Sequence, residues 1–249
     1  MTDRFHPAPL IRLAGAMRME YESRGTMLGI PKTLFFTPRI DDNFRSLRYG
    51  KMLETPLGVA AGPHTQMVQN VAAAWLCGGR YMELKTVQTL DAIDVAKPCI
   101  DAADEGYNCE WSQELSLRQS AEEYRKAWVL LHALRRYLQH PQGGTGPGFI
   151  FNISVGYNLE GIRRSNVQAF LDAMTRPDAR VRELCREIEP VFGVDLSDVP
   201  DVLTDSITIS TMHGCPPDEV EAIAAYFIRE RRMHTTVKLN PTLLGPVAL

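Results

Sequence analysis

Short apolar runs and longer segments of helical periodicity alternate along most of this chain. Five of the runs are rich in β-branched or small apolar residues and are bounded by Gly, Pro or polar residues, as strands commonly are. These runs are 57–62, 80–87, 149–155, 207–211 and 235–240. A parallel neighbour needs a crossover connection, so strands separated by helices tend to pair in parallel. The pattern therefore predicts an α/β fold with five parallel strands.

Apolar residues spaced three and four positions apart predict the helices between these strands. The predicted helices are 10–24, 70–76, 114–139, 165–174 and 181–192, with one more between the last two strands. Pro177 and Pro190 are expected to interrupt helical structure, since proline lacks the backbone N–H. The first helix precedes the first strand. We therefore expect an N-terminal extension at residues 1–50 that covers one end of a main domain at residues 51–249.

The composition argues against several classes of protein. A net charge of −3 and a pI near 6.1 indicate no basic surface for nucleic acid or for an anionic membrane. No apolar run approaches the ~18 residues of a membrane span, and the N-terminus lacks the pattern of a signal peptide. The 5 cysteines are scattered and odd in number, which argues against a disulfide framework. We expect a cytoplasmic protein without nucleic-acid or membrane partners.

Reactive side chains follow the last two predicted strands. His213 and Cys215 come after the fourth strand, and Lys238 and Asn240 lie at the end of the fifth. The carboxyl ends of parallel strands meet at one edge of a sheet, where α/β folds hold their active sites. This edge is the first candidate for a functional site.

The first two predicted strands add candidates at the same edge. The strand at 57–62 ends in small residues, which let a ligand lie against the backbone, although a tight turn would need Gly62 equally. Strict alternation in the strand at 80–87 places Glu83 and Lys85 on one face. If that face is buried, the two charges need each other or a ligand. If the strand is instead an edge strand, its polar face is solvated.

Several longer motifs follow one another in a fixed order. They are LGVAAGPHTQ at 57–66, GRYMELKTV at 79–87, FIFNISVGYN at 149–158, STMHGCPP at 210–217 and VKLNPTLLG at 237–245. They resemble the FMN-dependent dihydroorotate dehydrogenase and dihydropyrimidine dehydrogenase barrels. Over residues 29–245 the chain is more closely similar to the N-terminal region of the large flavoproteins described as selenate reductase subunits. The resemblance implies a TIM (β/α)8-type barrel with FMN across the carboxyl ends of its strands.

The same resemblance assigns roles to individual residues. The implied cofactor-binding residues are Ala60, Ala61, Gly62, Lys85, Thr86 and Lys238. The implied substrate-binding residues are Asn158, Ser210, Thr211 and Asn240. The implied proton-transfer residue is Cys215. His213 is its rival, because residues 210–214 replace the family's Asn-Leu-Ser ahead of the cysteine. The resemblance implies no metal ligand.

The implied chemistry is a flavin-dependent oxidation or reduction. Hydride or electrons would pass between FMN and a small planar amide-bearing substrate of the pyrimidine or purine kind. Lysines beside the flavin would stabilise negative charge on the reduced ring, and the amide of Asn158 would offer both a donor and an acceptor. Cys215 or His213 would transfer the proton on the opposite face of the substrate.

Five strands are fewer than the eight of a full barrel, and this difference affects the expected partners. In the family the FMN phosphate is held by loops after strands seven and eight, so we expect an incomplete barrel without these loops. Longer relatives add FAD and iron–sulfur clusters, which implies electron-transfer domains or subunits as partners. The alternative function is a non-catalytic barrel fragment whose open strand edges dock such subunits. A zinc or thiol hydrolase built on His64, His213 and Cys215 is a weaker alternative.

Overall fold

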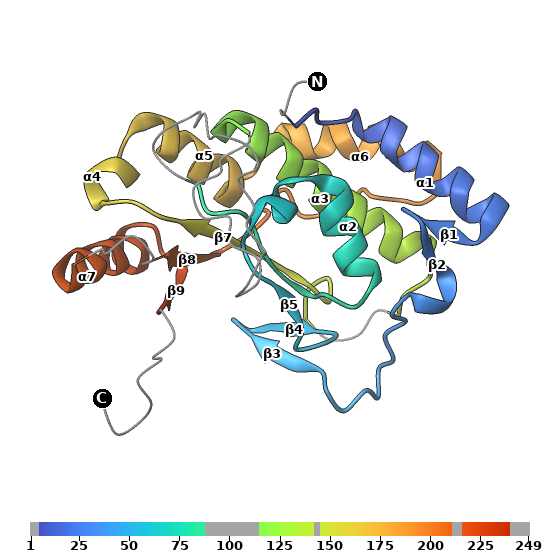
Figure 1. The fold of residues 1–249 in the computed structure, drawn as a ribbon, viewed down its shortest axis with the longest axis horizontal. Coiled ribbons are helices and arrows are strands. Elements are labelled where there is room, and N and C mark those ends of the chain that lie inside the picture. Colours follow the sequence, from blue (N-terminus) through green and yellow to red (C-terminus); the bar gives the residue numbers. More distant parts are fainter. Residues whose placement is uncertain (1–4, 88–114, 142–144, 211–215, 240–249) are drawn as a thin grey trace, which may run out of the picture.

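A five-stranded parallel sheet forms the centre of the molecule (Figure 1). The structure is a computed structural model that describes residues 5–87, 115–141, 145–210 and 216–239. The strands are β5 (Gly58–Val59), β6 (Tyr81–Glu83), β7 (Ile150–Val155), β8 (Ser206–Ser210) and β9 (His234–Lys238). Each pairs in parallel with the next strand in sequence. The predicted α/β fold with five parallel strands is confirmed, and the strand order is that of successive βα units in a barrel.

Helices connect the strands and lie mainly on one side of the sheet. They are α1 (Leu10–Arg24), α2 (Val68–Leu76), α3 (Leu117–Tyr137), α4 (Leu159–Ile162), α5 (Ser165–Thr175), α6 (Ala179–Phe192) and α7 (Pro217–Ala225). Shorter helical turns lie at Lys32–Leu34, Pro63–Gln66 and Tyr226–Glu230. Figure 1 shows α1, α2, α3, α5 and α6 gathered on one side of the strands. The predicted helices agree with these bounds to within a few residues.

Pro190 does not interrupt helical structure, contrary to the prediction. It lies inside α6, which continues to Phe192 and ends where Gly193 adopts a left-handed conformation. Because Pro190 is close to the carboxyl end of the helix, its missing N–H removes one hydrogen bond without ending the helix there. Pro177 lies between α5 and α6 and separates them as predicted.

Alternate residues of the central strands form the apolar core between the sheet and the helices. Phe151, Ile153, Ile207 and Ile209 are each at most 1 % exposed. Trp128 of α3 packs edge-on against Phe151, with ring centroids 5.3 Å apart. All residues of β7 are buried, which is typical of a strand covered on both faces.

The remaining alternate residues give the sheet a polar inner face. Its members include Tyr81, Glu83, Asn152, Ser154, Thr208, Ser210, Thr236 and Lys238, which the strand register brings side by side. Because β6 lies between β5 and β7, the edge-strand alternative for this segment is wrong. Glu83 is only 8 % exposed and Lys85 only 6 %. Charges and amides buried in this way require partners or a ligand.

The N-terminal part of the chain contributes to both the helical layer and the sheet end. Helix α1 packs on α3 and α6. Two antiparallel hairpins follow, β1 (Thr26–Met27) with β2 (Ile30–Pro31) and β3 (Ser46–Arg48) with β4 (Lys51–Leu53). The second hairpin contacts the amino-terminal ends of the strands, since Lys51 Nζ lies 2.7 Å from Asp205 Oδ1, one residue before β8. The predicted domain boundary at residue 50 falls in the turn of this hairpin and stays a prediction.

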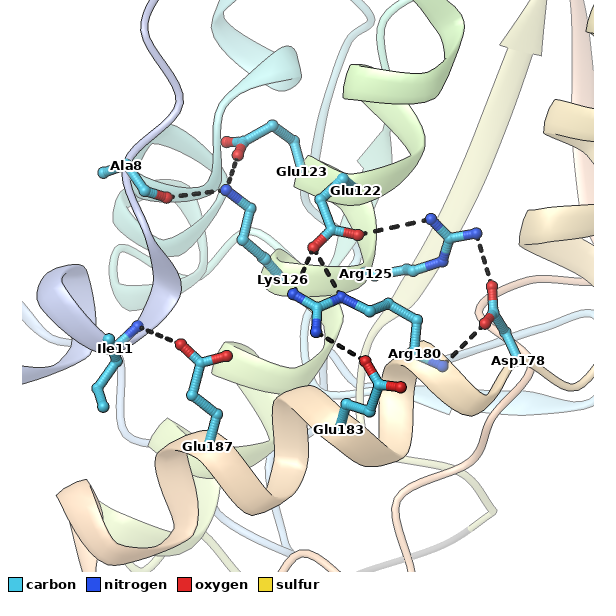
Figure 2. A network of polar contacts seen from close by, with 10 residues as sticks. All are labelled: Ala8, Ile11, Glu122, Glu123, Arg125, Lys126, Asp178, Arg180, Glu183 and Glu187. Atoms are coloured by element: carbon cyan, nitrogen blue, oxygen red, sulfur yellow. Dashed lines mark hydrogen bonds and ion pairs between the residues drawn. The ribbon is translucent and has the colours of Figure 1, made fainter.

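Figure 2 shows a polar network that connects the N-terminal segment with the helical layer. Lys126 of α3 donates to the carbonyl of Ala8 at 2.8 Å and forms an ion pair with Glu123. Glu123 also accepts the backbone N–H of Val68, the first residue of α2, at 3.0 Å. Further ion pairs join α3 to α6. The segment before α1 is therefore tied to the same buried carboxylate that caps α2.

A second buried charge cluster lies at the amino-terminal end of the sheet. Glu54, which follows β4, accepts from Arg80 Nε at 2.6 Å and from Arg135 Nη2 at 3.0 Å. None of the three side chains is more than 4 % exposed. The Arg80 guanidinium also lies 4.7 Å from the ring centroid of Trp75. The cluster joins the end of β4 to the start of β6 and to the last turns of α3.

Gly148→Ala is expected to lower the free energy of unfolding by about 2 kcal/mol. Gly148 has a φ of 82°, and a Cβ at this position would lie 2.6 Å from the Glu54 carboxylate, which two arginines hold in place. Gly29→Ala is the matched control, because Gly29 has a φ of 75° but nothing lies within 4 Å of its added Cβ. Denaturant titration of both variants measures the difference. Equal losses would contradict a steric role of Glu54.

Candidate functional site

A cavity of about 620 Å³ lies on the polar inner face of the sheet. It extends from the β3–β4 hairpin to the carboxyl ends of β6 and β9. Its lining includes Arg48, Tyr81, Glu83, Thr208, Thr236 and Lys238. The cavity therefore contains the inward-facing side chains of three strands, which the alternating pattern places on this face.

Lys238, Glu83 and Ala61 meet at the carboxyl ends of three strands. Lys238 Nζ lies 2.8 Å from Glu83 Oε1, and the N–H of Ala61 donates to Glu83 Oε2 at 3.3 Å. The structure thus brings together two of the residues expected to bind a cofactor. The residue that joins them, Glu83, was placed on the right face by strand alternation but received no role. The buried pair that alternation suggested was with Lys85, whereas the ion pair that the structure forms is with Lys238.

The expected cofactor residues of β6 lie next to this point. Lys85 is buried two positions beyond Glu83. Thr86 is half-buried, and its Oγ1 lies 2.8 Å from the hydroxyl of Ser154 on β7. Two hydroxyl groups are therefore paired across the ends of neighbouring strands, close to a buried lysine.

Asn152 is a buried amide on the same inner face. It is fully shielded from solvent, and its Nδ2 donates to Thr208 Oγ1 at 2.7 Å. Its Oδ1 has no hydrogen-bond partner among the residues that the structure describes. A buried acceptor without a partner is unfavourable, so the position suits a donor from a ligand or from water. This residue was not predicted from the sequence, although a single asparagine in an otherwise apolar run was a signal.

The loop after β5 forms one wall of the site. The carbonyl of Ala60 lies 3.0 Å from His64 Nε2, while Gly62 exchanges hydrogen bonds with the buried Thr65. Ala60 is exposed, Ala61 is half-buried and Gly62 is buried. These three expected cofactor residues therefore lie in a short segment whose conformation is held by local hydrogen bonds.

Two of the expected substrate residues, Asn158 and Ser210, lie after β7 and at the end of β8. The Oδ1 of Asn158 accepts the N–H of Gly161 at 2.9 Å, so this side chain caps α4. Ser210 is half-buried and lies in register with Lys238 at the end of β8. Asparagine is favoured immediately before a helix, so the cap gives Asn158 a structural role that was not predicted.

The other expected site residues lie outside the described residues. They are Thr211, His213, Cys215 and Asn240. Of the cysteines that the structure describes, Cys185 is buried, and its burial raises the pKa of the thiol to about 11. Within the described ranges no group of three or more His, Cys, Asp or Glu side chains is placed to hold a metal ion. No described helix combines the length and apolar character required to cross a bilayer.

Two tyrosines lie at the amino-terminal end of the cavity, and Tyr81 is one of its lining residues. The Tyr49 hydroxyl lies 2.6 Å from Thr236 Oγ1, and the guanidinium of Arg48 lies 4.4 Å from the Tyr49 ring centroid. Burial, and then a hydrogen bond with Tyr49, raises the pKa of Tyr81 far above its ordinary range. The phenol of Tyr81 therefore stays neutral and acts as a hydrogen-bonding group on the inner face.

Consecutive parallel βα units with a cavity on their inner face define this chain as a TIM-barrel domain. Residues 28–249 match the family model described as "Oxidoreductase YgfK, N-terminal TIM-barrel domain", and the chain belongs to this family. This confirms the predicted barrel fold and the predicted likeness to the N-terminal region of a larger oxidoreductase.

Two relatives in Escherichia coli, from strain K12 and from O157:H7, are named "Putative oxidoreductase YgfK". Each is 41 % identical to this chain over 267 residues, which cover 98 % of the chain and 25 % of the relative. The chain therefore spans about a quarter of the length of these relatives. A solved structure of a ligand-free type DHODH from Eimeria tenella aligns with a TM-score of 0.46 and 16 % identity, over 94 % of this chain and 70 % of that one.

Proposed function

We propose that this chain is the flavin-binding domain of a larger oxidoreductase and that FMN binds at the carboxyl ends of β5, β6 and β9. One observation carries the proposal. Lys238 extends across the inner face to Glu83, and the Glu83 carboxylate also accepts the N–H of Ala61. A cation, a carboxylate and a strand end of small residues thus lie together at the end of the sheet where TIM barrels hold their active sites.

The groups around this point fit a flavin ring. A flavin presents carbonyl oxygens and ring nitrogens at one edge, and it needs donors, acceptors and a flat surface. Hydroxyls are available from Thr86 and Ser154, and the buried Asn152 Oδ1 is an acceptor that lacks a partner among the described residues. Ala61 and Gly62 carry no side chain larger than a methyl group, so a ring can approach the backbone.

The proposed roles of the side chains follow from their chemistry. FMN, when bound, supplies hydride or electron transfer with a small planar amide-bearing substrate. Lys238 and Lys85 stabilise negative charge on the ring by electrostatic interaction in a shielded site. The oxygen of Asn158 already accepts a helix N–H, so we assign its NH₂ group to the substrate. We assign proton transfer to Cys215 or His213, both of which follow β8.

The proposed partners are the remaining domains of the larger protein. The family is one of oxidoreductases, and the chain covers only 25 % of its curated relatives. A flavin domain that reacts with a small molecule must exchange electrons with a second acceptor or donor. We propose FAD and iron–sulfur groups in those further domains for this role.

FMN binding to the purified chain tests the proposal. We expect Lys238→Ala to weaken the binding of oxidised FMN about tenfold or more, because it removes a charged hydrogen-bond donor to the oxygen and nitrogen atoms at the edge of the ring. Flavin fluorescence quenching and the visible absorption spectrum measure the affinity. Lys51→Ala is the matched control, since Lys51 also forms a 2.7 Å ion pair but lies at the opposite end of the sheet.

The control variant should retain the affinity of the unmodified chain. Riboflavin serves as a second probe, because the described contacts are suited to the ring. A chain that binds neither FMN nor riboflavin would contradict the proposed function, and so would an equal loss of affinity in the two lysine variants.

A further inference from the structure

We propose that Glu83 is a positioning residue that holds the Lys238 ammonium over the inner face of the barrel, in the place where it contacts FMN. This inference deepens the proposed function and rests on it for the identity of the ligand. The positioning itself is a property of the protein without ligand, and it can be measured without one.

The two carboxylate oxygens of Glu83 contact two other strands. Oε1 forms an ion pair with the ammonium of Lys238 on β9, and Oε2 accepts the backbone N–H of Ala61 at the end of β5. The Glu83 side chain is 11 % exposed. A carboxylate that is so shielded and so fully engaged has little freedom to change rotamer, which makes it a rigid anchor for a flexible lysine.

The ion pair connects two strands that are not adjacent in the sheet. Strands β6 and β9 are not neighbours, because β7 and β8 lie between them. Asn152 on β7 and Thr208 on β8 form the inner face between Glu83 and Lys238, and the Asn152 amide donates to the Thr208 hydroxyl. Lys238 therefore reaches over this amide–hydroxyl pair to find its carboxylate, and it is directed toward the inner face.

Without the Glu83 carboxylate, the Lys238 side chain is expected to adopt other rotamers. The Lys238 side chain remains 35 % exposed, and a lysine carries several flexible bonds and a strongly hydrated ammonium. Solvent would compete effectively with any single contact on the inner face. Glu83 thus favours the rotamers in which the positive charge is presented to the ligand and not to water.

The chain contains a closely matched lysine for comparison. Lys51 is 33 % exposed and lies 2.7 Å from Asp205, whereas Lys238 is 35 % exposed and lies 2.8 Å from Glu83. The two amines should acylate at comparable rates while both ion pairs are intact. A change in the acylation rate of Lys238 but not of Lys51 in a Glu83 variant is then a local effect of the substitution at Glu83.

Lysine acylation followed by peptide mass spectrometry tests the positioning role in the protein without flavin. Glu83→Gln keeps the size of the side chain and an acceptor for the Ala61 N–H but removes the charge. We expect the acylation rate of Lys238 to rise about fivefold relative to Lys51 in the same sample, because an amine released from its ion pair is open to the reagent. Glu83→Asp keeps the charge on a shorter side chain and should give a smaller rise.

FMN affinity gives the second readout. If Glu83 acts through Lys238, Glu83→Gln weakens FMN binding in the otherwise unmodified chain but has little further effect when Lys238 is already Ala. An unchanged Lys238-to-Lys51 acylation ratio in a folded Glu83 variant would overturn the inference, as would full additivity of the two substitutions. A raised ratio in a chain that binds no FMN would uphold the positioning of Lys238 while contradicting the proposed function.

Discussion

Glu54→Gln is expected to lower the free energy of unfolding by about 3–5 kcal/mol, the largest effect that we anticipate for a single substitution. The carboxylate lies between the guanidinium groups of Arg80 and Arg135, and both contacts are buried. Removal of the negative charge leaves two cations facing each other in a region of low dielectric. Each would keep only neutral partners, such as the carbonyl of Trp75 for Arg80 and that of Pro141 for Arg135.

Denaturant titration measures this loss, and an exposed ion pair provides the control. Arg163 and Glu230 lie 2.8 Å apart with side chains 52 % and 57 % exposed. Glu230→Gln should therefore change the free energy of unfolding by less than about 1 kcal/mol. A loss for Glu54→Gln that is no larger than that of Glu230→Gln would contradict the view that this cluster joins the hairpin, β6 and α3.

Acidification is expected to destabilise the protein well above the pH at which carboxylates titrate. Burial, and then nearby arginines, lowers the pKa of both His132 and His140 to about 3. The unfolded chain binds protons at these histidines near pH 6.5, whereas the folded chain excludes them down to about pH 3. Stability is therefore lost as the pH falls through this window, by about 1.4 kcal/mol per pH unit for each histidine.

Denaturant titrations at pH 6.5 and pH 5 should differ by about 3 kcal/mol for the two histidines together, because the unfolded histidines are already half protonated at pH 6.5. His132→Phe should roughly halve this difference, because it removes one titrating group while an aromatic ring still packs against Trp128 and Phe149. His6→Asn is the control, since His6 is exposed. The explanation fails if the slope with pH is the same in His132→Phe as in the unmodified chain.

The helices and strands could be predicted because their patterns reflect burial directly. A strand that packs on helices shows apolar residues at every second position, and Phe151 and Ile153 illustrate this on β7. A helix that packs on other helices with one face shows apolar residues three and four positions apart, as in α1 and α6. Pro190 departed from the pattern, because a proline near the end of a helix removes little backbone hydrogen bonding.

The candidate site was only partly predictable. Strand ends and strand alternation pointed to Ala61, Glu83 and Lys85 from local sequence alone. The partner of Glu83 could not be found in this way, because Lys238 is distant in the chain and only the arrangement of β6 and β9 brings the two together. Asn158 illustrates the opposite difficulty, since one side chain that suits a ligand also suits a helix cap.

The order of the βα units and the alternation of polar and apolar residues along the strands could be predicted from local sequence periodicity. The parallel pairing followed from the helical segments between the strands, because parallel neighbours need a crossover connection. The tertiary structure alone decided which polar groups on that face meet. Lys238 reaches Glu83 and Asn152 reaches Thr208 because strands from distant parts of the chain come together at one side of the sheet. A buried charge interacts with the groups that lie within a few ångströms of it, and for residues distant in the chain these groups become neighbours only when the sheet has formed.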